Sequence, residues 1–523
     1  MHIFLHRFCA FVALGIALSI PALVNAATNV DWTGATNTNF ETGTNWSGNA
    51  APANDTTTNI AHFTGSVTAN QPQITVSRSV NGLLFDTAGG GWTLSSSSTS
   101  NILTVGVGGI STIGQTGGTD IISANLNPNI SQIWVAGSGG TLQIDGTVSL
   151  TASRTISVGT PGNTGIVIFN GTNTNFLGTL AVITGSFGIG NNSALGTGAL
   201  SLGGTNSNTP TIFASGGART ISNNITLLAT AGGGNATISG SDALTLNGTL
   251  TNSGAGRTLS VNNSATTTIG GNVFLSEAAG TGRTLTINGT GDATVSGVIA
   301  NFNGTGTAGN LIKSGINTLT LTNSNTYTGT TQVTGGTLII NGNQSSANGA
   351  VSVSNSGSVL GGIGTIGGAT TINANGTITG GTKGSGNTIV SGNIGALTLN
   401  NNLTFTGSSG NPATYLVDIA NGANNSDKLT IGGILDLNNA FDQISFNGTP
   451  DGTSSYLLAS ATGGIQGTFS LGSAPTGYQF IYSTNNLTLA PIPEPSTWMA
   501  GALALMVIGY SLQRRVAAQR AKR

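Results

Sequence analysis

Reactive side chains are scarce in this sequence of 523 residues. It has one cysteine, Cys9, and three histidines, of which only His62 lies after Ala26. Without thiols in the rest of the chain, disulfides, thiolate nucleophiles and zinc–thiolate sites are excluded. With one histidine, a multi-histidine metal site lacks its ligands. We therefore expect no enzyme activity, no metal ion and no cofactor.

Charge is equally sparse. Charged residues make up 6% of the chain, against about 25% in a typical soluble domain. Between residues 27 and 490, eight Lys and Arg face 14 Asp and Glu, a net charge of 8 − 14 = −6. Nucleic-acid binding depends on clustered Lys and Arg that displace counterions. This balance excludes nucleic acid as an expected partner.

Carboxylates are the remaining candidates for chemistry, because glycosidases work with two carboxyl groups a few ångströms apart. Nothing in the spacing shows such a pair, and isolated Asp residues commonly accept backbone hydrogen bonds in turns. The densest group comprises Asp418, Asp427, Asp436, Asp442 and Asp451. Polysaccharide cleavage thus remains only an alternative function.

The segment from Met1 to Ala26 has the features of a secretory signal peptide. Arg7 supplies a positive charge, Phe8 to Ile20 form an apolar run, and Val24-Asn25-Ala26 is a small-residue cleavage site. We predict cleavage between Ala26 and Ala27, and therefore export.

Short alternating runs fill residues 27–490. In Thr141-Leu142-Gln143-Ile144 and Thr318-Leu319-Thr320-Leu321, apolar residues alternate with polar ones, which predicts strands with one buried face. Asn-Gly and Gly-Gly pairs between the runs favour tight turns. Neither a helical period nor a domain boundary is evident. With few aromatics and 83 glycines, this pattern favours a β-solenoid of about 20 coils, each of about 20 to 25 residues.

One part of this region resembles a known repeat. Thr326-Tyr327-Thr328-Gly329-Thr330, followed by Gly335-Gly336-Thr337-Leu338, resembles the autotransporter-associated β-strand repeat, with the best match over residues 309–381. The resemblance implies a right-handed parallel β-helix for residues 27–490.

Residues 491–523 form a separate C-terminal segment. Pro493, Glu494 and Pro495 precede an uncharged apolar stretch, predicted as a transmembrane helix at about 496–513, and Arg514 and Arg515 begin a basic tail. Prolines around Glu494 hold it in an extended segment. This arrangement resembles the PEP-CTERM sorting signal. That resemblance implies an exosortase partner, an inner-membrane intermediate and delivery to the cell surface or matrix of a Gram-negative bacterium that makes exopolysaccharide. The alternative is a permanent single-span anchor.

Four tryptophans lie in the first third of the exported chain. Trp32 and Trp46 are candidates for stacking on sugars, while the alternative is that aromatic residues cap the open end of the solenoid. The sequence as a whole predicts an exported, non-enzymatic surface or matrix protein associated with exopolysaccharide. A polysaccharide-binding or polysaccharide-degrading β-helix is the alternative.

Overall fold

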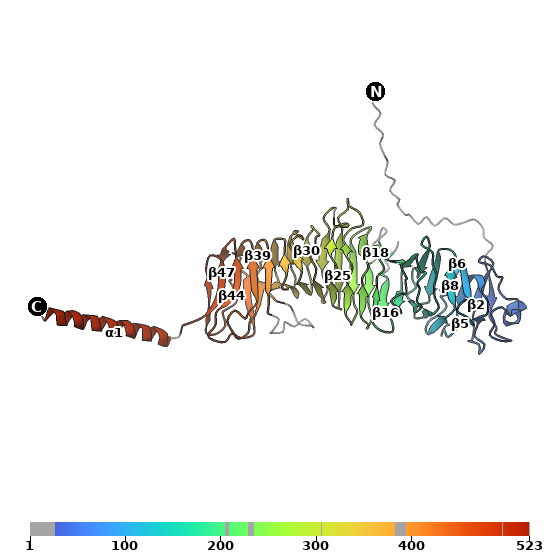
Figure 1. The fold of residues 1–523 in the computed structure, drawn as a ribbon, viewed down its shortest axis with the longest axis horizontal. Helices are drawn as coiled ribbons and strands as arrows, with labels where there is room; N and C mark the ends of the chain where they lie inside the picture. The colour runs from blue at the N-terminus through green and yellow to red at the C-terminus, as the bar shows by residue number, and fades with distance from the viewer. Residues whose placement is uncertain are drawn as a thin grey trace, which may run out of the picture.

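The structure, a computed structural model, describes residues 27–203, 209–228, 235–304, 306–381, 394–493 and 495–521, with the backbone alone for 495–502. The chain winds through successive coils into an elongated β-solenoid, and helix α1 (Pro495–Arg520) extends beyond its end (Figure 1). Within the described part of residues 27–490, helical structure is limited to two 3₁₀ turns, η1 (Gly43–Asn45) and η2 (Ser47–Asn49). The all-β prediction for this region is confirmed.

The strands form four stacked sheets, numbered here 1 to 4. Sheet 1 contains β1 (Thr28–Asp31), β2 (Asn59–Phe63), β4 (Arg78–Phe85), β6 (Ile102–Thr112), β8 (Asn125–Pro128), β9 (Gln132–Ala136), β11 (Thr155–Val158), β13 (Thr179–Val182), β15 (Ala199–Leu202), β18 (Ile225–Leu228), β21 (Leu250–Ser253), β24 (Val273–Phe274) and β27 (Ile299–Ala300). Sheet 2 contains β3 (Gln73–Ile74), β5 (Thr93–Ser96), β7 (Thr119–Ile122), β10 (Thr141–Ile144), β12 (Ile166–Phe169), β14 (Ser186–Ile189), β16 (Thr211–Ala214), β19 (Ala236–Ile238), β22 (Arg257–Val261), β25 (Thr284–Gly289), β28 (Asn310–Lys313), β30 (Thr331–Val333), β33 (Val351–Val353), β36 (Thr370–Asn373), β39 (Leu403–Thr406), β42 (Leu435–Leu437) and β45 (Ile465–Gly467). Sheet 3 contains β17 (Arg219–Ile221), β20 (Leu244–Leu246), β23 (Thr267–Ile269), β26 (Ala293–Val295), β29 (Thr318–Leu321), β31 (Thr337–Ile340), β34 (Ser358–Gly361), β37 (Gly376–Thr379), β40 (Ala413–Asp418) and β43 (Asp442–Asn447). Sheet 4 contains β32 (Asn343–Gln344), β35 (Thr365–Ile366), β38 (Ala396–Leu399), β41 (Lys428–Ile431), β44 (Tyr456–Ala461), β46 (Tyr478–Tyr482) and β47 (Asn486–Pro491).

Alternation along each strand builds the core. In β10, Leu142 and Ile144 are buried while Thr141 and Gln143 are partly exposed, and most strands repeat this pattern. Leu142 pairs with Val167 of β12 one coil later, so buried side chains stack on buried side chains along the rod. The predicted burial of one strand face is therefore confirmed.

The number of strands in a coil changes along the rod: β10 to β15 alternate between sheets 2 and 1, whereas most later coils have three strands. In the middle of the rod the chain passes from sheet 2 to sheet 3 to sheet 1, as in β16, β17 and β18, and from β32 onward sheet 4 takes the place of sheet 1. Every described strand pair is parallel except at the end, where β47 runs antiparallel to β44 and β46. Because an antiparallel pair cannot continue the same stacking, β46 and β47 terminate the parallel stack.

Coil length varies more than the sequence suggested. Val353 pairs with Ile372, and Ile372 pairs with Phe405, so the first of these coils is shorter than predicted and the second is much longer. The predicted length of about 20 to 25 residues per coil is therefore too narrow a range. Sheet 2 has 17 strands among the described residues, fewer than the predicted 20 coils.

The Arg-Thr phrases that recur at residues 154–155, 219–220, 257–258 and 283–284 do not mark the coil repeat. Thr155 lies in sheet 1, Arg219 in sheet 3, and Arg257 in sheet 2. Even within sheet 2, Arg257 pairs with Leu285 and not with Arg283. The same local phrase therefore occurs at the start of strands in three different sheets.

Asparagine side chains tie neighbouring coils together at the corners. The buried Asn325 accepts the Ile299 N–H at 2.7 Å through Oδ1, and the buried Asn173 accepts the Val148 N–H at 2.7 Å in the same way. At a corner the chain leaves the sheet ladder, so backbone groups there need side-chain partners. This explains much of the asparagine content of the chain.

Candidate functional site

The C-terminal carboxylates are structural groups in this fold. Asp427 is fully buried, and its carboxylate accepts hydrogen bonds from Thr379 Oγ1 at 2.6 Å, Gly395 N at 3.0 Å and Asp418 N at 3.1 Å. Burial raises the pKa of Asp427 to about 6, and it also raises the pKa of Asp418. Since neither carboxyl group faces solvent, the pair offers no site for a substrate.

The other three aspartates of this group are spread over different environments. Asp442 is buried, and burial raises its pKa to about 6. Asp451 is in a turn, where hydrogen bonds from the Ser454 side chain and the Ser454 and Thr453 N–H groups lower its pKa. Asp436 bonds to the nearby Asn438. None of the three forms a carboxylate pair at a solvent-facing site.

His62 stands between two carboxylates on the first three coils. Its Nδ1 lies 2.8 Å from Asp31 Oδ1, and its Nε2 lies 3.0 Å from Asp86 Oδ2. Burial raises the pKa of Asp86, but hydrogen bonds from Thr64 and His62 outweigh it and leave that pKa lowered. His62 thus contacts one carboxylate from the coil before it and one from the coil after it.

Trp32 and Trp46, the predicted sugar contacts, lie inside the N-terminal end of the rod. Trp32 is 3% exposed and Trp46 is 1% exposed, and their rings meet edge to face at 4.9 Å. Phe40 and Phe63 pack against Trp46. Because the ring faces are covered by other aromatics, neither indole can stack on a sugar in this structure. Their packing is that of an aromatic cap over the first coils.

Sheet 3 carries an outward row of threonines that we name the threonine ladder. Each of these residues pairs with the next across consecutive strands β17, β20, β23, β26 and β29, and each is at least partly exposed. None of their hydroxyl groups has a hydrogen-bond partner among the described residues. The ladder ends where Thr320 pairs with the buried Ile339. Its members are Thr220, Thr245, Thr268, Thr294 and Thr320.

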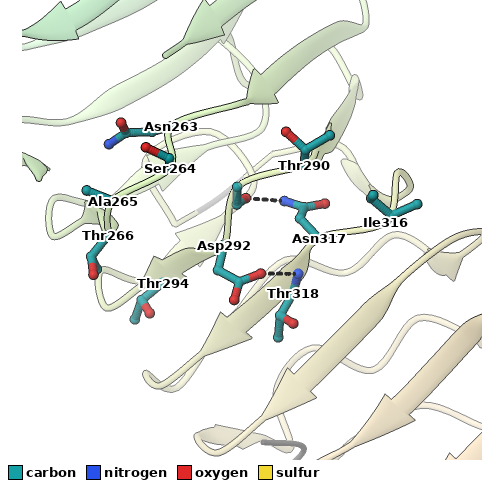
Figure 2. Close-up of a pocket in the computed structure, with 11 residues that line it drawn as sticks. Asn263, Ser264, Ala265, Thr266, Thr290, Asp292, Thr294, Ile316, Asn317 and Thr318 are labelled. Carbon is teal, nitrogen blue, oxygen red and sulfur yellow. Dashed lines mark hydrogen bonds between the residues drawn. The ribbon is translucent and has the colours of Figure 1, made fainter. Parts of the chain in front are cut away.

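A recess of about 490 Å³ lies beside the ladder, at the corner that leads into sheet 3 (Figure 2). Asp292 is exposed there, and its Oδ1 accepts the Thr318 N–H at 2.7 Å. Ile316 forms an apolar wall and is 68% exposed. The residues that line the recess are Asn263, Ser264, Ala265, Thr266, Thr290, Gly291, Asp292, Thr294, Ile316, Asn317 and Thr318.

Two buried asparagines belong to the lining of this recess. Asn263 and Asn317 are buried, and each uses its Nδ2 on a backbone carbonyl, Asp242 O and Gly291 O respectively. The Oδ1 atoms of both have no hydrogen-bond partner among the described residues. Sequence reasoning missed this site because its residues come from three coils, and only the strand pairing shows that they lie side by side.

The arrangement of the side chains does not indicate a metal site. In the ranges that the structure describes, no group of three or more His, Cys, Asp or Glu side chains is placed to hold a metal ion. The recess contains one carboxylate, Asp292, and no histidine.

The C-terminal segment contains the expected helix. Pro493 follows β47, α1 begins at Pro495, and Arg514 lies over the ring of Tyr510 at 5.5 Å. Arg515 is exposed on the same helix. No helix among the described residues is both long and apolar enough to cross a membrane, so the predicted span at 496–513 is not supported. Glu494 and the predicted signal peptide, including Ala26 at its cleavage site before Ala27, lie outside the described residues.

Comparison with known proteins supports one part of the sequence prediction. A family model described as the passenger-associated transport repeat matches residues 311–340, the segment from β28 to β31. This match lies inside the predicted repeat region 309–381 and confirms that the chain carries autotransporter-associated β-repeats. No curated protein matches the chain.

Proposed function

We propose that this protein is an exported, non-enzymatic β-solenoid displayed on the surface or in the extracellular matrix of a Gram-negative bacterium. The observation that carries the proposal is a continuous parallel rod containing a passenger-type repeat at residues 311–340. Such a rod exposes long rows of side chains, and each coil contacts only its neighbours. We propose a right-handed coil, in keeping with the strong preference of parallel crossovers.

Delivery would depend on the C-terminal segment. Pro493-Glu494-Pro495, the helix α1 and the basic residues Arg514 and Arg515 occur in the order of a PEP-CTERM signal. Figure 1 shows α1 standing clear of the rod, and apolar side chains from Leu503 to Leu512 are exposed on it. Exposed apolar surface of this kind favours membrane insertion. We propose an inner-membrane intermediate on which an exosortase acts near Glu494.

Mass spectrometry of the C-terminal peptide from the native protein tests this route. We expect the chain to end near Pro495 and the protein to be recovered outside the inner membrane. An intact Arg523 would instead show a permanent anchor. Glu494→Ala should leave the C-terminus uncut, whereas the matched variant Glu277→Ala, in the rod, should be processed normally. Processing of Glu494→Ala at the normal site would argue against recognition of the tripeptide.

Association with exopolysaccharide is the second part of the proposal. Uncharged polar rows on the rod and a hydroxyl-lined recess support contact with sugars rather than with nucleic acid. The buried carboxylates do not support the alternative of polysaccharide degradation, since a glycosidase needs two accessible carboxyl groups. We therefore favour binding over cleavage.

A further inference from the structure

We propose that the threonine ladder and the recess beside it bind an extended, uncharged, β-linked polysaccharide chain that lies along the axis of the rod. This inference rests on the proposed function and names the surface and the class of glycan. Two observations carry it: the in-register row of hydroxyl groups and the recess lined by hydroxyl groups and the Asp292 carboxylate.

The spacing of the ladder suits a linear glycan. Neighbouring strands lie about 4.8 Å apart, so successive threonines present one hydroxyl and one methyl group at each such step. This step is close to the length that one pyranose unit adds to an extended β-1,4-linked chain. Each sugar can then meet one coil, with hydroxyls bonding to threonine oxygens and C–H groups resting on the methyls. Sugars in a coiled, α-linked chain would lose this register.

The ladder's hydroxyls are available for such contacts. Thr245, Thr268 and Thr294 are partly exposed, and none of their hydroxyls bonds to another described residue. Strand backbone holds the row in place, so little conformational entropy is lost when a ligand binds. The row is therefore preorganised along five coils.

Local charge selects against acidic polymers. Asp292 is the only charged residue that lines the recess. Two cationic side chains nearby donate hydrogen bonds to backbone carbonyl groups. Lys313 Nζ donates to Ser314 O, Gly315 O and Gly335 O. The Arg219 guanidinium donates to Ser215 O and Gly216 O. Because the one charged group among the residues that line the recess is a carboxylate, a uronic acid chain seated there would meet a like charge.

The recess supplies the directional contacts. Asp292 can accept charge-assisted hydrogen bonds from sugar hydroxyls, which are stronger than neutral ones. Ile316, exposed at the rim, offers an apolar surface to the C–H face of a ring. Thr266 and Thr318 flank Asp292 on the neighbouring coils, two positions before ladder residues Thr268 and Thr320. Recess and ladder thus form one continuous surface.

Calorimetric titration of the purified full chain in detergent with cellohexaose or chitohexaose tests the proposal. We expect binding of both, and no binding of an alginate hexamer. The triple variant Thr245→Val, Thr268→Val and Thr294→Val should weaken binding by about tenfold or more, since each lost hydrogen bond contributes modestly. Asp292→Asn should weaken it by about threefold to tenfold, because a neutral amide is a weaker acceptor.

A matched triple variant on sheet 2, Thr286→Val, Thr371→Val and Thr404→Val, serves as the control because these threonines are also partly exposed. It should bind as the unaltered chain does. If the ladder triple variant does not fold, the single variants Thr245→Val and Thr294→Val replace it. Equal loss in both triples, tighter binding of alginate, or no binding of either neutral hexamer would overturn the proposal. If the protein is exported correctly but binds no glycan, this inference alone is wrong. If the protein is retained in the cytoplasm, the proposed function is wrong.

Discussion

Gly349 lies directly over Gly329, one coil along the rod, so closely that a Cβ atom on Gly349 would stand 1.8 Å from the Gly329 carbonyl oxygen. The same approach joins Gly329 to Gly309 at 2.2 Å and Gly368 to Gly349 at 1.8 Å. This column of glycines crosses the matched repeat, at the corner before each strand of sheet 2. Close stacking of backbone, rather than turn geometry, therefore requires glycine here.

Gly349→Ala should destabilise the repeat by about 2 kcal/mol or more, because the methyl group forces neighbouring coils apart. Hydrogen exchange of β30 and β33 and the thermal midpoint measure the effect. Gly280→Ala is the control, since a Cβ atom there meets nothing within 4 Å. Similar midpoints for the two variants would contradict the stacking explanation.

Asn325→Ala should cost about 1–3 kcal/mol of stability, because it leaves the Ile299 N–H without its 2.7 Å partner in a buried corner. Denaturant unfolding monitored by circular dichroism gives this value. The exposed Asn348→Ala, a short distance along the chain, should change stability by less than about 0.5 kcal/mol. An equally small change in Asn325→Ala would mean that water replaces the side chain.

Acidic conditions should stabilise the C-terminal coils. Burial raises the pKa of Asp427 to about 6, above its ordinary value of 3.8, so the folded state binds more protons than the unfolded state between these values. The resulting stability is fully present below about pH 4 and is lost as the pH rises through about 6. A shift of this size corresponds to about 3 kcal/mol at most.

Hydrogen exchange of β40 and β41 at pH 4.5 and pH 7.5 tests this dependence. We expect slower opening at the lower pH, after correction for the intrinsic exchange rate, and a reduced difference in Asp427→Asn. The exposed Asp145→Asn should leave the difference intact. Greater protection at pH 7.5 in the unaltered protein would reverse the sign and refute the prediction.

Local pattern predicted much of this fold. The alternation of Leu142 and Ile144 with polar neighbours identified buried and exposed strand faces, because that period depends on one strand alone. The phrase around Tyr327 identified the repeat, where the coils happen to have nearly constant length. Sheet membership was not predictable, as the Arg-Thr phrases in three sheets show, because it depends on where corners fall in coils of unequal length.

The candidate binding surface could not be predicted from the sequence for the same reason, the unequal length of the coils. The interval from Thr245 to Thr268 is shorter than the interval from Thr268 to Thr294, so no fixed period aligns them. The sequence does contain Thr-x-Thr runs, but only strand pairing shows which threonines share a row. Trp32 shows a related point: its residue type left both a sugar contact and an aromatic cap open, and its burial, which favours the cap, depends on neighbours distant in the chain.

Incubation of the full chain with a panel of polysaccharides should release no new reducing ends. The carboxyl groups whose pKa values are raised to about 6, Asp120, Asp427 and Asp442, are buried, whereas the recess holds Asp292 alone. A glycosidase acid and its partner carboxylate must both reach the glycosidic oxygen or its sugar ring. Reproducible cleavage that disappears in Asp292→Asn but persists in Asp145→Asn would show that the recess is catalytic and that the non-enzymatic assignment is wrong.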